Sequence, residues 1–99
     1  MTIEKAIFYL LIECGIYPTS RGFAYLQDAI VLCYKDEDKM YLITKVLYPE
    51  IAKRHGTSPT AVERAIRYAI HNSKSEHRAN SKFIASAVWF LNQLDRPLV

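Results

Sequence analysis

The sequence predicts an all-α fold, a compact bundle of about five to six helices in a single domain over residues 1–99. Apolar residues recur at intervals of three and four along most of the chain, which is the spacing of one helix face. Glycine, proline and capping residues separate these periodic stretches. No apolar–polar alternation typical of strands persists beyond a few residues.

Two amphipathic helices are expected in the first third of the chain. The first begins after Thr2 as a cap, ends at Gly15, and has one apolar face: Ile3, Ala6, Ile7, Leu10, Leu11 and Cys14. A loop over residues 16–20 is expected because Pro18 disfavours helix at the residue before it. The second helix ends at the charged run 35–39, interpreted as a solvated corner, and has another apolar face: Phe23, Leu26, Ala29, Ile30, Cys33 and Tyr34.

The third expected helix is short, whereas the fifth is long. A third is expected from residue 40 to about 46, a fourth from Pro49 at its first turn to about residue 55, and a fifth from residue 59 to roughly 72. After a polar segment over 72–80, the last helix ends near Pro97 and has an inner face: Phe83, Ile84, Ala87, Val88, Leu91 and Leu94. Core packing is the favoured interpretation of Trp89 and Phe90, whereas their exposure would indicate a partner surface.

Positive charge is concentrated in one segment. Residues 1–52 hold five basic and seven acidic residues, a net of −2, whereas residues 53–78 hold six basic and two acidic residues, a net of +4. A surface that neutralises nucleic-acid phosphates needs this local excess more than a high total charge.

The basic segment contains the pattern of a helix-turn-helix. Ala52 allows two helices to cross closely, Gly56 suits a turn with positive φ, and Ser58 with Pro59 forms a firm helix start. The inner face has apolar residues at helical spacing: Ile51, Val62, Ala65, Ile66 and Ala69. The second helix of such a motif enters the DNA major groove, so residues 58 to about 72 are the expected recognition helix.

The outward side chains of this motif are the candidate DNA contacts. Thr60, Glu63 and Arg64 are expected at base edges, with Arg64 on guanine and Glu63 on cytosine. The expected contacts to the DNA backbone are Tyr48, Lys53, Arg54, Ser58, Arg67, His71 and Lys74. The alternative is an ordinary solvated helix face, in which Glu63 and Arg67 form an i,i+4 pair.

Other function classes find little support in the sequence. The chain has no glycine-rich phosphate loop and no recognisable nucleophile, so neither an enzyme nor a cofactor is expected. Cys14 and Cys33 are interpreted as reduced, buried thiols, and the three histidines lack zinc-ligand spacing. No signal peptide is recognised, and no apolar run reaches the roughly 20 residues of a membrane span, so a cytoplasmic location is expected.

Several stretches of the chain together match one known pattern: residues 43–53, Thr57 and 62–70, and beyond them Gly15, 22–30 and 80–85. In these stretches the chain resembles the C-terminal effector domain of the sporulation-initiation regulator, stage 0 sporulation protein A. The resemblance implies an all-α transcription factor module that binds a short promoter box, often as tandem copies, with Glu63 and Arg64 as base readers and Arg67 on the backbone contact surface. The partners it implies are double-stranded DNA, a second copy as homodimer or tandem neighbour, and RNA polymerase.

The chain departs from that family pattern in three places. Ala61 stands where the family commonly has a basic residue, and the segment 72–79 before the last helix is much shorter. The family also carries an N-terminal receiver domain, and none fits before Thr2, so the chain is expected to be a stand-alone effector-like protein, which Met1 favours, or one domain of a larger regulator. These departures keep open an alternative function, a protein-interaction module that modulates a full-length regulator.

Overall fold

The computed structural model describes residues 1–95, which fold into five α-helices without a strand. The helices are α1 (Ile3–Glu13), α2 (Arg21–Lys35), α3 (Tyr48–His55), α4 (Pro59–His71) and α5 (Asn80–Asp95). Two short turns join α2 to α3, the 3-10 turn η1 (Glu37–Tyr41) and the π-helical turn η2 (Ile43–Leu47). The predicted all-α bundle is confirmed. Pro97, expected near the end of the last helix, lies outside the described residues.

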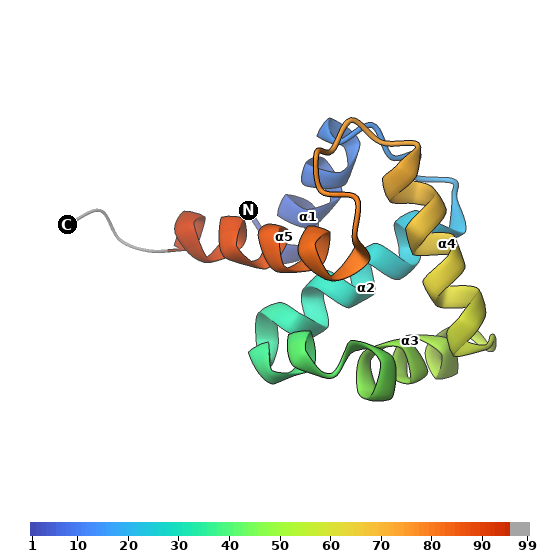
Figure 1. The fold of residues 1–99 in the computed structure, drawn as a ribbon. Coiled ribbons are helices and arrows are strands. Elements are labelled where there is room, and N and C mark those ends of the chain that lie inside the picture. The colour runs from blue at the N-terminus through green and yellow to red at the C-terminus, as the bar shows by residue number, and fades with distance from the viewer. Residues whose placement is uncertain (96–99) are drawn as a thin grey trace.

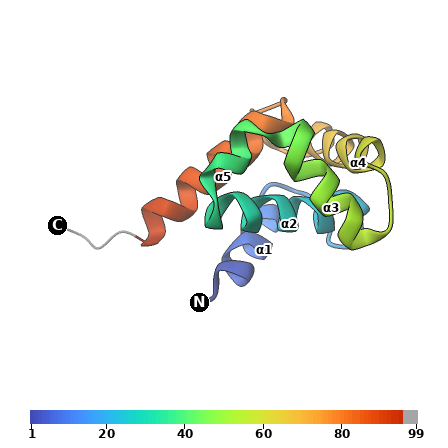
Figure 2. The ribbon, with the colours of Figure 1, turned by 90° about the horizontal axis from the view of Figure 1, so that it is seen from below.

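Helix α2 is the centre of the fold and packs against each of the other four α-helices. Figure 1 shows α3 and α4 together at one corner of the molecule. Helix α5 begins near α4 and runs away from this corner toward the C-terminus. The view from below in Figure 2 shows the same corner, with the turn that joins α3 to α4 at the edge of the molecule. This arrangement leaves the outer surfaces of α3 and α4 open to a partner.

The core is built from the apolar faces of all five helices. No polar or charged residue among those described is buried. The fully enclosed larger side chains are Ile7, Leu11, Leu26, Ile30, Leu47, Ile51, Ile66, Ile70, Ile84, Leu91, Val62 and Val88. The same helical periodicity that predicted the helices therefore also places their buried faces.

The predicted ends of α1 are confirmed. The Thr2 hydroxyl accepts a hydrogen bond from the Lys5 N–H at 3.1 Å, and Gly15 adopts a φ of +80° directly after the helix. Ser20 begins α2 in the same way, accepting from the Phe23 N–H at 3.2 Å. Each side-chain oxygen satisfies a backbone N–H that the helix itself leaves without a partner.

The prediction of a single helix over residues 40–46 was wrong, because the structure divides this segment between η1 and η2. Asp36 begins η1 by accepting from the Asp38 N–H at 3.2 Å, and Leu42, with φ −126° and ψ 39°, interrupts the helical path. The N–H groups of Val46 and Leu47 then share the Leu42 carbonyl oxygen, which is the wider π turn. The run 35–39 is also more than a solvated corner, since Lys39 pairs with Glu50 of α3 at 2.8 Å.

The aromatic residues of α5 also differ from expectation. Trp89 is 64% exposed, Phe90 42% and Leu94 61%. Trp89 lies about 100° round the helix from the buried Val88, so its side chain faces away from the core. In Figure 1 the C-terminal half of α5 extends past the other helices, which agrees with the exposure of Leu94. Core packing was therefore the wrong interpretation for these three residues.

None of the described helices has both the length and the apolar character that crossing a membrane would require.

Candidate nucleic-acid interface

Helices α3 and α4 are joined by a tight turn whose geometry follows from two residues. Gly56 ends α3 in the left-handed conformation, with φ +63°, and its N–H donates to the Ala52 carbonyl. The Thr57 N–H donates to the same carbonyl at 3.0 Å. Ser58 then caps α4 by accepting from the Ala61 N–H at 3.1 Å, and Pro59 occupies the first turn. The predicted turn glycine, cap and helix start are all confirmed.

The inner faces of the two helices are buried as the pattern predicted. Ile51 and Ala52 of α3, and Val62, Ile66 and Ile70 of α4, are at most 2% exposed. Ala65 and Ala69 of α4 lie against α2, where Gly22 makes the close approach possible. The predicted recognition helix therefore rests on α2 and α3 along one side and leaves the other side to solvent.

The outer face of α4 carries three of the predicted base contacts, and one of them, Glu63, is already paired within the chain. Thr60 and Arg64 are exposed, and Arg64 has no hydrogen bond or ion pair with residues 1–95. Glu63 is half-buried and accepts a hydrogen bond from the Arg67 guanidinium at 3.1 Å. The i,i+4 pair considered from the sequence is thus present in the DNA-free chain, but a surface pair of this kind is worth only about 0.3–0.5 kcal/mol.

The basic end of α3 lies at the turn before α4. Lys53 is exposed, and Arg54 is 3.6 Å from the Glu50 carboxylate, a loose contact that leaves its guanidinium accessible. His55 is exposed but its side chain contacts α2, where its Nε2 lies 2.6 Å from Asp28 and its ring packs edge-on against Tyr25. The sequence did not indicate this connection between α3 and α2.

The other predicted backbone contacts have differing roles in the structure. The Ser58 hydroxyl is engaged in capping, and the His71 carbonyl accepts from Arg78 at 3.1 Å while its ring is exposed. The aliphatic part of the Lys74 side chain lies against Gly15, and the Lys74 backbone N–H donates to the Cys14 carbonyl at 2.7 Å. Lys74 thereby ties the segment after α4 to the end of α1.

Tyr48 is the predicted contact that lies deepest, at 6% exposed. Its hydroxyl oxygen accepts a hydrogen bond from Asn80 at 3.0 Å. Burial raises the pKa of Tyr48, the Glu63 carboxylate adds to the increase, and the Asn80 hydrogen bond opposes it. The tyrosine acts as a bridge between helices, a role that its sequence position did not reveal.

Two hollows flank the N-terminal half of α4. The larger, about 410 Å³, lies between η2, α4 and the start of α5 and includes Thr44, Glu63, Arg67, Arg78 and Ser81. The smaller, about 190 Å³, includes Thr44, Pro59 and Thr60. The surface beside the recognition helix is therefore concave and carries both guanidinium and hydroxyl groups. Arg78 is a basic residue of this surface that motif analysis missed, because it lies outside the helix-turn-helix.

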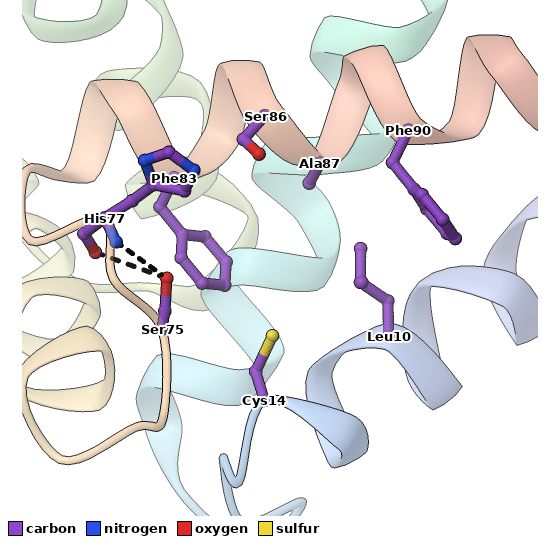
Figure 3. A pocket seen from close by; sticks show the side chains of 8 residues that line it. All are labelled: Leu10, Cys14, Ser75, His77, Phe83, Ser86, Ala87 and Phe90. Atoms are coloured by element: carbon purple, nitrogen blue, oxygen red, sulfur yellow. Dashed lines mark hydrogen bonds between the residues drawn. The ribbon is translucent and has the colours of Figure 1, made fainter.

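A further cavity, of about 180 Å³, lies elsewhere, between α1, α5 and the segment that joins α4 to α5. Figure 3 shows Leu10 of α1 and Cys14, the residue directly after α1, facing Phe83 and Phe90 of α5 across it. Burial raises the pKa of the Cys14 thiol, and the neighbouring Glu13 adds to the increase. None of the candidate DNA contacts lines this cavity, so it is unrelated to the recognition surface.

The two thiols and the metal-ligating side chains form no further site. Cys14 is half-buried, Cys33 is buried, and both are free. Within residues 1–95, no group of three or more histidine, cysteine, aspartate or glutamate side chains is arranged to hold a metal ion.

A family model described as the C-terminal region of the sporulation initiation factor Spo0A matches residues 7–87. The matched region begins within α1, includes the whole of α3 and α4, and ends within α5.

Proposed function

The chain belongs to the family of the Spo0A C-terminal domain, the DNA-binding domain of a sporulation regulator, and we propose that it binds duplex DNA sequence-specifically as a transcription regulator. The observation that carries the proposal is the capped α3–α4 unit, which leaves the outer face of α4 unobstructed. Local structure and charge support the proposal at this surface, and family membership supports DNA binding by the domain.

In the proposed complex, α4 lies in the major groove with its N-terminal half toward the base edges. Arg64 is suited to guanine O6 and N7, because its guanidinium is free and exposed. Glu63 accepts from cytosine N4, and Thr60 lies at the start of the helix where a base edge comes within reach. The Glu63–Arg67 pair separates at small cost when each side chain meets its DNA partner.

The phosphate contacts in this proposal come from both sides of α4. Lys53 and Arg54 lie at the turn before the helix, while Arg67, His71 and Lys74 follow along it and beyond its end. Arg78 joins this set because it lines the same hollow as Arg67. Such contacts give affinity and orientation and no direct sequence information. Ser58 and Tyr48 contribute mainly through the structure that they support.

The same proposal includes the setting of the protein. We place it in the cytoplasm with access to the chromosome, as a single effector-like domain over residues 1–99 that acts without a cofactor and without catalysis. A second copy on a neighbouring site and RNA polymerase are its proposed protein partners.

The decisive experiment is fluorescence-anisotropy binding to a duplex that carries the family's promoter box and to a scrambled duplex, each at two salt concentrations. The proposal expects tighter binding to the box at both concentrations and a loss of affinity for both duplexes as salt rises. Equal affinity for the two duplexes would contradict sequence-specific recognition.

A second candidate function is a protein-interaction module that modulates a full-length regulator. The exposed Trp89 and Leu94 on α5 favour it, since large apolar side chains at a surface are typical of partner sites. Ala61, in place of the basic residue common in the family, is consistent with weakened DNA contact. Size-exclusion chromatography with a receiver-containing family member tests it, because an apolar contact persists at high salt and a DNA-bridged one does not.

A further inference from the structure

Asn80, the first residue of α5, lies where three helices meet. Its Nδ2 donates to the Tyr48 hydroxyl oxygen at 3.0 Å and to the Glu63 backbone carbonyl at 3.3 Å. A carbonyl oxygen only accepts hydrogen bonds, so the group that faces it must be the amide nitrogen, and both N–H donors of that group are used. One side chain of α5 therefore connects the start of α3 to the middle of α4.

The three residues are far apart in the sequence and partly or fully withdrawn from solvent. Asn80 follows Tyr48 by 32 positions and follows Glu63 by 17 positions. Tyr48 is buried, while Asn80 and Glu63 are half-buried. Hydrogen bonds at such positions are partly shielded from competing water, and breaking one leaves a polar atom without its partner.

The connection meets α4 at the turn that carries the proposed base readers. Glu63 accepts from Asn80 through its backbone carbonyl and from Arg67 through its carboxylate, and Arg64 is the next residue. A binding group must be held within about 0.5 Å of its productive position to discriminate between ligands. A side chain that fixes the backbone at Glu63 therefore acts on readout without touching DNA.

We propose that Asn80 is a positioning residue for base recognition, which holds α4 against α3 through the Glu63 carbonyl and the Tyr48 hydroxyl. The proposal rests on the proposed function, since it presumes that Glu63 and Arg64 contact bases. It differs from a general role in stability because it predicts a selective loss of discrimination between DNA sequences.

The test compares Asn80→Ala and Tyr48→Phe with Asn92→Ala in the full chain. Asn92 is the matched control, because it lies on the same helix and donates one side-chain hydrogen bond, to Glu37 at 3.3 Å, without contacting α4. Tyr48→Phe is the milder variant, since it keeps the buried ring and removes only the hydroxyl. Thermal melting by circular dichroism first establishes that each variant is folded at the assay temperature.

The readout is the ratio of Kd values for the scrambled duplex and the promoter-box duplex. Asn80→Ala is expected to lower this ratio about tenfold and to leave the scrambled-duplex Kd and the salt slope unchanged. Tyr48→Phe is expected to lower it by a smaller factor, and Asn92→Ala to leave it as in the wild type. Amide hydrogen exchange in the DNA-free protein should be faster around Glu63 in Asn80→Ala only.

Two results would overturn the inference while the proposed function stands. One is a wild-type ratio in folded Asn80→Ala and Tyr48→Phe, and the other is an equal loss of affinity for both duplexes, which is what a purely structural role gives. A wild-type protein that does not discriminate between the duplexes refutes the proposed function itself, and the positioning role for readout with it.

Discussion

Gly22 of α2 and Ala65 of α4 lie in backbone contact where the central helix crosses the recognition helix. A β-carbon built on Gly22 would collide with the Ala65 carbonyl oxygen and would stand 2.7 Å from the Ala69 β-carbon. Since the nearest obstacle is backbone, no side-chain rotation relieves it. The absence of a side chain at residue 22 therefore sets the distance between α2 and α4, and with it the support beneath the DNA-facing surface.

Gly22→Ala is expected to destabilise the fold. Overpacking of a tight interface costs about 1–3 kcal/mol, which exceeds the roughly 0.5–1 kcal/mol that alanine gains over glycine within a helix. The measurement is the free energy of unfolding from urea denaturation. Arg21→Ala is the control, because it changes the neighbouring exposed residue and should lie within about 0.5 kcal/mol of the wild type. A Gly22→Ala protein as stable as the wild type would show that α4 shifts freely on α2.

The cap of the recognition helix gives a second prediction. Ser58→Ala removes the acceptor for the Ala61 N–H and is expected to lower the free energy of unfolding by about 0.5–2 kcal/mol. Ser58→Asp restores an acceptor, so its stability should return toward the wild type. Urea denaturation of both variants measures the difference, and similar stability of Ser58→Ala and Ser58→Asp would contradict the assigned cap.

Ser58→Asp also tests whether this position lies near the DNA backbone. A carboxylate beside a phosphate is repelled, so Ser58→Asp should bind every duplex more weakly than the wild type although it is folded. Anisotropy with the scrambled duplex measures this, and unchanged affinity would remove Ser58 from the proposed contacts.

The helix-turn-helix could be predicted from the sequence because its determinants are local. Gly56, Ser58 and Pro59 act on backbone within four residues of themselves, and each has one dominant structural preference. The apolar spacing of α3 and α4 then indicated which faces are buried. Such local conformational preferences persist in the folded protein when the tertiary contacts favour the same backbone conformation.

The parts that could not be predicted depend on contacts between distant residues. Asn80 meets Tyr48, and His55 meets Asp28, across 32 and 27 positions of the chain. The split between η1 and η2 arises at Leu42, whose apolar character fits helix and turn equally well. Periodicity assigned Leu94 to the inner face of α5 but could not show that the neighbouring helices end before reaching it.

Arg64 and Lys53 are expected to respond differently to substitution. Arg64→Ala should cost roughly 1–3 kcal/mol on the promoter box and relax the preference at one base pair, because a base contact is lost. Lys53→Ala should weaken all duplexes about equally and lower the salt slope by about one unit, because one phosphate contact is lost. Anisotropy titrations across a series of single-base variants at several salt concentrations separate the two effects. The assigned roles fail if both substitutions give the same pattern.

Because Cys33 is buried, the free energy of unfolding is expected to fall at alkaline pH. Burial raises the pKa of Cys33 to about 11, against an ordinary value of 9.0; Lys39 opposes the shift, and Asp36 and Glu50 add to it. Between these two values the unfolded chain loses the thiol proton while the native chain keeps it, so the native state binds more protons and the free energy of unfolding falls as pH rises. The contribution is complete below pH 9 and is lost as pH approaches 11. Urea denaturation at a series of pH values should therefore show a smaller alkaline decline for Cys33→Ala than for the wild type. Parallel declines in the two proteins would show that the Cys33 thiol does not titrate differently in the native and unfolded states.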